Sequence, residues 1–292
     1  MKVGFIGLGL MGSLMTARLR GAGFSLSTFD KNGKGSCASP RVAALDADVL
    51  VTMLPDGKAV LKVVRAALPG LKRTAIVIDM SSSDPADSLQ ASRLLKKHNV
   101  HFLDAPVSGA KAKAKDGTLA IMVGGDAAVL RRARPVLSRL GTAIFHTGGV
   151  GSGHATKALN NYLGAAGTIA GFEALILGEK FGLDPKVLID VINASTGRNS
   201  TTERKIPQQI FTRAFASGFK LALMTKDVGI ARSIARTLHV ETPYLDKTLK
   251  IWREALSRLP AGADHTEMYR YLKRLKRLKS RPRRGGPRSA RH

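Results

Sequence analysis

The sequence is short of cysteine, of aromatic residues and of long apolar runs. Cys37 is the one cysteine among 292 residues, so the chain cannot close an internal disulfide and nothing argues for an oxidising compartment. The longest apolar stretch, residues 158–178, contains two asparagines and a glutamate, which predicts a buried helix and not a membrane span. Met1 leads directly into a predicted strand and leaves no room for a signal peptide. We therefore expect a soluble, cytoplasmic protein.

Acidic residues are also scarce, and none lies between Arg270 and the C-terminus, where eleven basic residues are found. The net charge of the chain is +26. Two interpretations remain open: attraction to nucleic acid or anionic substrates, or a solvated basic surface that ends in a frayed tail. Aromatic residues make up 5% of the chain and do not interleave with the basic stretches for base stacking, which favours the second interpretation. We predict that residues 273–292 form a basic, disordered tail.

The first half of the chain alternates short apolar runs with helical stretches. Near-continuous apolar strands separated by helices predict a parallel sheet that is covered on both faces. From about Thr156 the pattern is helical throughout. The sequence therefore predicts an α/β, doubly wound parallel-sheet domain over residues 1–149 and an all-helical domain over residues 150–272. The candidate strands are residues 2–7, 25–30, 48–54, 75–80, 100–105 and 119–125.

A glycine-rich motif, "GFIGLGLMG", ends the first strand and opens a helix, which is the context of a dinucleotide-binding site. Gly7 permits a tight turn, Gly9 lets a pyrophosphate approach the backbone, and Gly12 lets the helix pack closely on the strand. The helix N-terminus then offers free N–H groups to the phosphates. The predicted cofactor contacts are Gly7, Leu8, Gly9, Leu10, Met11 and Gly12.

Asp30 ends the second strand, eighteen residues after Gly12, where a carboxylate can accept hydrogen bonds from a ribose 2′-hydroxyl. It would repel a 2′-phosphate, so NAD is favoured over NADP, although Lys31 and Lys34 would soften that preference. The alternative is that Asp30 only begins a turn. Seventeen residues separate Asp30 from Asp48, so we expect a short crossover and an open adenine end.

Two further loops follow strand ends, where ligands of open parallel sheets bind. One contains Met53, Leu54 and Pro55, and the other contains three serines, residues 81–83, before a helix that Ser83 or Asp84 can cap. We expect both loops to face the cofactor.

A polar turn after the fifth strand, in "DAPVSGAKAKAKDG", predicts a carboxylate site. Ser108, Gly109 and Ala110 can offer backbone N–H groups and one hydroxyl to an anion. Lys111, Lys113 and Lys115 alternate with alanines behind it. They would steer an anion, or form a solvated charge run.

The start of the helical half, "GVGSGHATKALNNYL", contains a lysine that can move a proton. Lys157 lies near the helix N-terminus, where a cation is unfavourable, and partial burial would lower the pKa of its ammonium as a general acid/base requires. Asn160 and Asn161 lie on the same face and would hold a substrate. Lys226, in "LMTKDVGIA", would close on the cofactor. The alternative for Lys157 is an ordinary surface lysine.

Through these motifs the chain resembles the β-hydroxyacid dehydrogenase family, the group of 3-hydroxyisobutyrate dehydrogenase and tartronate semialdehyde (2-hydroxy-3-oxopropionate) reductase. The likeness covers residues 2–272 in four blocks: "GFIGLGLMG", "DAPVSG…GTLAIMVGG", "GSGHATKALNN" and "KDVGIA". It implies a Rossmann domain, an all-α domain, a homodimer or homotetramer, and NAD(P)-dependent oxidation of a 3-hydroxy acid to its semialdehyde or the reverse. No metal site is predicted.

The resemblance also implies roles for single residues. They are the catalytic lysine (Lys157), its substrate-binding neighbour (Asn161), the substrate-carboxylate turn (Ser108, Gly109), the position of a cofactor-contacting threonine (Ser82) and the lysine near the nicotinamide (Lys226).

The chain departs from the family at three places. The substrate turn of the family reads Ser-Gly-Gly with another glycine three residues on, and these glycines are Ala110 and Lys113 here. The crossover after Asp30 is shorter, and the basic tail has no counterpart. Two other functions compete: an imine reductase of the same fold, a branch that usually lacks Lys157, and a non-enzymatic binder of nucleic acid. The presence of Lys157 argues against both.

Overall fold

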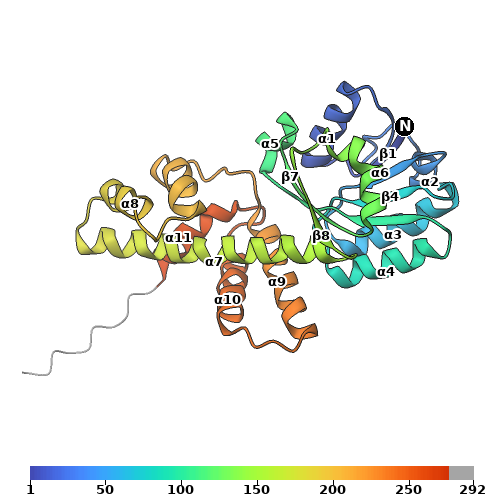
Figure 1. Ribbon diagram of the computed structural model, residues 1–292. Coiled ribbons are helices and arrows are strands. Elements are labelled where there is room, and N and C mark those ends of the chain that lie inside the picture. The colour runs from blue at the N-terminus through green and yellow to red at the C-terminus, as the bar shows by residue number, and fades with distance from the viewer. Residues whose placement is uncertain (276–292) are drawn as a thin grey trace, which may run out of the picture.

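A computed structural model describes residues 1–275 of the chain. A twisted sheet flanked by helices forms one part of the molecule, and a group of helices forms the other (Figure 1). The long helix α7 (Ser152–Phe181) belongs to both, because its first turns pack on the sheet and the rest passes through the helical part. This arrangement confirms the predicted α/β sheet followed by helices.

The sheet has the strand order β2-β1-β3-β4-β5-β7-β6, and β8 pairs with β7. The predicted parallel arrangement holds from β2 to β5, but β7 runs antiparallel to β5 and β6, so the prediction of a wholly parallel sheet is wrong at this edge. The reason is the short connection: only β6 and the seven-residue helix α5 (Ala110–Asp116) join β5 to β7. The strands are β1 (Lys2–Ile6), β2 (Ser25–Phe29), β3 (Val49–Thr52), β4 (Ile76–Asp79), β5 (His101–Asp104), β6 (Val107–Ser108), β7 (Ala120–Gly124) and β8 (Ala143–Gly148).

Helices cover both faces of the sheet. On one face, α1 (Leu10–Gly21), α5 and α6 (Ala127–Leu137) bury apolar side chains in a common core with the strands. On the other face, α2 (Pro40–Ala44), α3 (Gly57–Ala67) and α4 (Pro85–Lys96) do the same. The helix α2 has only five residues, which confirms the short crossover expected after Asp30.

The remaining helices pack around α7 and share a core that contains Phe172 and Trp252, both fully buried. The helix α11 continues to Arg274, so ordered chain extends past the start of the predicted tail, and residues 276–292 lie outside the described residues. No helix of the described part is both long enough and apolar enough to span a membrane. The elements are α8 (Pro185–Asn193), the π-helix η2 (Thr201–Phe211), α9 (Leu221–Thr237), α10 (Pro243–Arg258), the short η3 (His265–Glu267) and α11 (Met268–Arg274).

Candidate active site

The glycine-rich loop after β1 has the geometry that a dinucleotide requires. Gly7 has a φ of +101°, and a Cβ placed on it would lie 2.3 Å from the carbonyl oxygen of Met53. A Cβ on Gly12 would lie 1.9 Å from the oxygen of Gly7, so close helix–strand packing also requires glycine there. At Gly9 a Cβ would meet no atom within 4 Å, and no side chain caps α1, which begins at Leu10. The loop therefore leaves open space in front of free N–H groups, which fits a pyrophosphate.

The side chain of Asp30 is hydrogen-bonded to this loop. Its carboxylate accepts the backbone N–H of Leu8 at 2.7 Å and that of Asn32 at 2.8 Å. Burial raises the pKa of Asp30, but these two backbone hydrogen bonds and the nearby Lys34 outweigh it, so the pKa lies below the ordinary value. The residue therefore begins a turn, as the alternative had it, and remains ionised at the strand end. Each carboxylate oxygen accepts one N–H and keeps a lone pair for a ribose hydroxyl.

The loops after β3 and β4 are hydrogen-bonded to each other. The hydroxyl of Ser81 accepts the backbone N–H of Leu54 at 2.9 Å. Ser83 donates to the buried carboxylate of Asp79 at 2.8 Å, and Asp84, not Ser83, caps α4. These contacts hold both loops at the carboxyl edge of the sheet, beside the glycine-rich loop.

Helix α9 reaches across to the same loops. The ammonium of Lys226 donates to the carbonyl oxygens of Pro55 (2.9 Å) and Ser82. The hydroxyl of Ser82 donates to the carboxylate of Asp227 at 2.9 Å. Lys226 and Ser82, which were predicted to contact the cofactor, are therefore also the residues that join the helical part to the cofactor edge of the sheet.

Lys157 lies in the second turn of α7 and is half-buried. Burial is the largest effect on its ammonium and lowers the pKa below the ordinary 10.5. The charge of Lys226 also lowers the pKa, and the opposing effect of Asp227 is smaller than that of burial. Within residues 1–275 the ammonium makes no hydrogen bond or ion pair. An amine of lowered pKa with an uncommitted nitrogen can accept or donate a proton.

Asp227 stands at the centre of this group and was not predicted from the sequence. Its side chain is buried, with 2% of the residue exposed, and it accepts the amide of Asn161 at 2.6 Å as well as the hydroxyl of Ser82. The carbonyl oxygen of Asn161 accepts the amide of Asn160 at 3.1 Å. The available signal was an acidic residue on the otherwise apolar face of α9, directly after Lys226.

The predicted carboxylate turn follows β6. Gly109 has a φ of +142°, and Ala110 has a φ of +55°, a left-handed conformation that favours glycine. The side chain of Lys113 covers Gly109, and that of Lys111 reaches Gly218 in the loop before α9. Ala110 thus keeps the backbone shape of a glycine at the expense of local strain.

The buried carboxylate of Asp104, at the end of β5, connects this turn to α7. It accepts the backbone N–H of Gly151 at 2.7 Å and that of His154 at 2.9 Å, and so satisfies the start of the helix. The imidazole of His154 is hydrogen-bonded to Ser88 at 2.7 Å. Lys157 lies one turn after His154, and Ser108 lies four residues after Asp104.

The structure thus brings Lys157, Asn161, Lys226 and Ser82 into one group around Asp227. Within the described residues no hydrogen bond joins the turn at residues 108–110 to this group. The link between them is Asp104, which lies four residues before Ser108 and accepts hydrogen bonds from the start of α7. Met53 contributes its carbonyl oxygen next to Gly7.

Comparisons with known proteins agree with this geometry. A family model described as the NAD binding domain of 6-phosphogluconate dehydrogenase matches residues 2–148. A second one, described as NAD-binding of NADP-dependent 3-hydroxyisobutyrate dehydrogenase, matches residues 151–272.

Individual relatives match over most of the chain. The chain is 35% identical to 2-(hydroxymethyl)glutarate dehydrogenase of Eubacterium barkeri, over 86% of this chain and 88% of that protein. It is 34% identical to the NAD-dependent L-serine dehydrogenase of Pseudomonas aeruginosa, over 90% and 95%. A solved structure of Mycobacterium tuberculosis 3-hydroxyisobutyrate dehydrogenase with L-serine is 34% identical, with a TM-score of 0.87 over 93% of this chain and 99% of that one.

The strain at Ala110 generates a prediction. Ala110→Gly relieves a left-handed alanine that costs roughly 1–2 kcal/mol, and this gain exceeds the roughly 0.4–1 kcal/mol of added unfolded-state entropy. We expect the free energy of unfolding in urea to rise by up to about 1 kcal/mol. The matched control is Ala112→Gly, exposed on the same helix without a positive φ, which should lose about 0.5–1 kcal/mol. Equal losses in the two variants would contradict the prediction.

Proposed function

The chain belongs to the β-hydroxyacid dehydrogenase family of 3-hydroxyisobutyrate dehydrogenase, and we propose that it interconverts a small 3-hydroxy acid and its semialdehyde with Lys157 as the general acid/base. The observation that carries this proposal is the half-buried ammonium of Lys157, whose pKa is lowered and whose nitrogen has no other partner among residues 1–275. Membership of the family makes the reaction an NAD(P)-dependent oxidation of a CH–OH group, or its reverse.

In the direction of oxidation, the neutral amine of Lys157 takes the proton of the substrate hydroxyl as the C–H bond gives up its hydride. NAD(P), held at the glycine-rich loop, would supply the hydride acceptor. In the reverse direction the ammonium of Lys157 returns the proton to the carbonyl oxygen. A nitrogen that is shared with no other group is suited to both tasks.

Asp227 and Asn161 set the environment of the amine. The carboxylate of Asp227 faces Lys157 and limits how far burial lowers the pKa of the ammonium. It also holds the amide of Asn161 at 2.6 Å, which orients the remaining lone pair of the Asn161 oxygen. We propose that Asn161, with Asn160 beside it, binds the substrate hydroxyl, and that Ser108, Gly109 and Ala110 bind its carboxylate.

The cofactor proposal is NAD, with NADP as the alternative. Models and relatives of the family include both nucleotides. An ionised Asp30 at the end of β2 supports NAD, because it would repel a 2′-phosphate. The residues proposed to contact the cofactor are Gly7, Leu8, Gly9, Leu10, Met11, Gly12, Asp30, Met53, Leu54, Pro55, Ser82 and Lys226.

A homo-oligomer and a cytoplasmic location complete the proposal. Large apolar side chains are exposed at the far end of α7 and on α8, where they could pack on a second copy: Leu177, Phe181, Val187 and Val191. Phe181 is 84% exposed. We propose residues 1–149 as the cofactor domain and 150–272 as the substrate and assembly domain.

Replacement of Lys157 tests the catalytic role. Lys157→Met should lower kcat for 3-hydroxyisobutyrate about 10²–10⁴-fold, because proton transfer loses its base, while the thermal unfolding midpoint stays close to wild type. The control is Lys180→Met, which removes an exposed lysine from the same helix and should leave kcat unchanged. Full activity in Lys157→Met would refute the assignment.

The lowered pKa predicts the pH dependence. For oxidation the amine must be neutral, so kcat/KM should rise with pH and level off above an apparent pKa below 10.5. For reduction the ammonium is required, so kcat/KM should fall over the same range. Asp227→Asn removes the charge that raises this pKa, and the inflection of both profiles should move to lower pH. An inflection that moves upward, or stays in place, would contradict this role of Asp227.

Asp30 can be tested by nucleotide preference. Asp30→Asn removes the charge that opposes a 2′-phosphate, so the ratio of kcat/KM for NADP over NAD should rise at least about tenfold, equivalent to about 1.4 kcal/mol. Asp46→Asn, an exposed change outside the proposed cofactor contacts, should leave the ratio unaltered. An unchanged ratio in Asp30→Asn would rule out its contact with the ribose.

A further inference from the structure

The helical part contains a second half-buried lysine that the proposed mechanism does not use. The ammonium of Lys205, on the π-helix η2, donates to the hydroxyls of Thr168 (2.9 Å) and Thr201 (3.1 Å). Within residues 1–275 it forms no ion pair with a carboxylate. Burial, with a smaller contribution from Arg204, lowers its pKa to about 8, so it is still charged near neutral pH. A desolvated cation held only by hydroxyls is costly unless an anion completes the site.

An imidazole with an unused nitrogen lies close to it. His265 is 5% exposed, and its Nδ1 lies 3.1 Å from the carbonyl oxygen of Phe219, to which it can donate. Its Nε2 is buried and has no partner within the described residues. Burial and then the charge of Lys205 lower the pKa of His265 to about 4. The carboxylate of Asp264 lies 3.5 Å from Nδ1, so Nε2 is the ring nitrogen left for a ligand.

Through Thr168, Lys205 reaches the same strip of α7 that carries Lys157. Lys157, Asn161, Gly164 and Thr168 follow one another at helical spacing on one face. A Cβ placed on Gly164 would meet no atom within 4 Å, so no side chain covers the strip at this position. The rise from Asn161 to Thr168 is about 10 Å.

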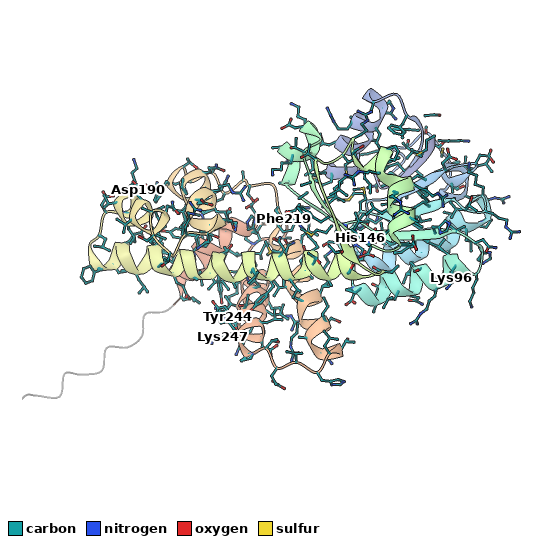
Figure 2. All side chains as sticks on the ribbon, in the orientation of Figure 1. Lys96, His146, Asp190, Phe219, Tyr244 and Lys247 are labelled. Atoms are coloured by element: carbon teal, nitrogen blue, oxygen red, sulfur yellow. The ribbon has the colours of Figure 1, made fainter. Side chains whose placement is uncertain are left out.

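The far end of this strip also reaches the carboxylate turn. The ring of Phe219 packs edge-on against His265, with ring centroids 5.7 Å apart, and lies at the junction of sheet and helices (Figure 2). Next to it, Gly218 is covered by the side chain of Lys111 from the turn. A series of contacts from Lys205 and His265 through Phe219 and Gly218 therefore leads to the turn proposed to bind the first carboxylate.

We propose that Lys205, with His265 beside it, binds a second carboxylate of the substrate, so that the preferred 3-hydroxy acid is a dicarboxylate. The inference rests on the proposed function and names its substrate class. The first carboxylate binds at residues 108–110, the hydroxyl faces Lys157, and the side chain of the substrate runs past Gly164 toward Lys205. Nothing in this role touches the reacting atoms, so Lys205 determines specificity and not the chemical step.

The test compares substrates that differ only at the distal group. 2-(Hydroxymethyl)glutarate carries a CH2–COO− group in place of one hydrogen on the methyl carbon of 3-hydroxyisobutyrate, and its C5 monoamide keeps the shape without the charge. Homologues with one and two more methylene groups allow for the length of the strip. For at least one diacid, wild-type kcat/KM should exceed that of the matching monoamide at least about tenfold, as a charge-assisted hydrogen bond provides. Equal values at every length would overturn the proposal.

Variants then assign the effect to Lys205. Lys205→Met should lower kcat/KM for the preferred diacid at least about tenfold, mainly through KM, and change that for 3-hydroxyisobutyrate less than about twofold. Lys205→Arg should restore part of the loss. Lys96→Met, which removes an exposed lysine from α4, is the charge control. Parallel losses on both substrates in a folded Lys205→Met protein would show a structural role and overturn the inference.

Failure of the proposed function gives a different result. If wild type oxidises none of these compounds, the proposed activity is wrong. Binding of the diacids to wild type and Lys205→Met by calorimetry then decides the role of Lys205, because equal affinities would overturn it as well. If 3-hydroxyisobutyrate is oxidised without any preference for a diacid, only the further inference fails.

Discussion

The position of the Lys157 amine depends on one buried carboxylate. Asp104 is fully buried at the end of β5 and accepts two N–H groups from the first turn of α7. A negative charge at a helix N-terminus satisfies orphan donors and complements the helix dipole, and burial strengthens both effects. Because α7 is continuous from Ser152 to Phe181, this anchor fixes the direction of the whole helix and of Lys157 on its second turn.

A second carboxylate, Asp227, joins the parts of the site that the chain keeps far apart. From α9 it accepts hydrogen bonds from Asn161 on α7, 66 residues away in the sequence, and from Ser82 after β4, 145 residues away. Lys226 reinforces the same junction through the carbonyl oxygen of Pro55. The cofactor edge of the sheet and α7 are therefore joined by hydrogen bonds from two neighbouring residues of α9, Lys226 and Asp227. The charge of Asp227 raises the pKa of Lys157, but no hydrogen bond joins the two side chains.

Much of the site could be predicted from the sequence, because its signals are local. The spacing of Gly7, Gly9 and Gly12 predicted a separate steric reason at each position; the structure confirms those for Gly7 and Gly12 and leaves open space at Gly9. The antiparallel strand β7 and the additional strand β8 could not be predicted, since the pairing direction depends on how a short connection returns to the sheet. Asp227 was missed for a related reason: its partners come from two distant segments, and an acidic residue on an otherwise apolar face of α9 does not by itself identify them.

The face of α7 that carries the site shows why small residues recur along it. At Gly171 a Cβ would lie 3.1 Å from the side chain of Thr201, so glycine there lets η2 pack directly on the helix. Seven residues earlier, at Gly164, a Cβ would meet nothing, so glycine there leaves room instead of closing it. Gly171 therefore allows η2, which carries Lys205, to pack on α7. Gly164 leaves the surface of α7 uncovered at its own position, between η2 and Asn161. A helix that served only as a structural spine would fill the second position with an apolar side chain, because covering its backbone would stabilise it.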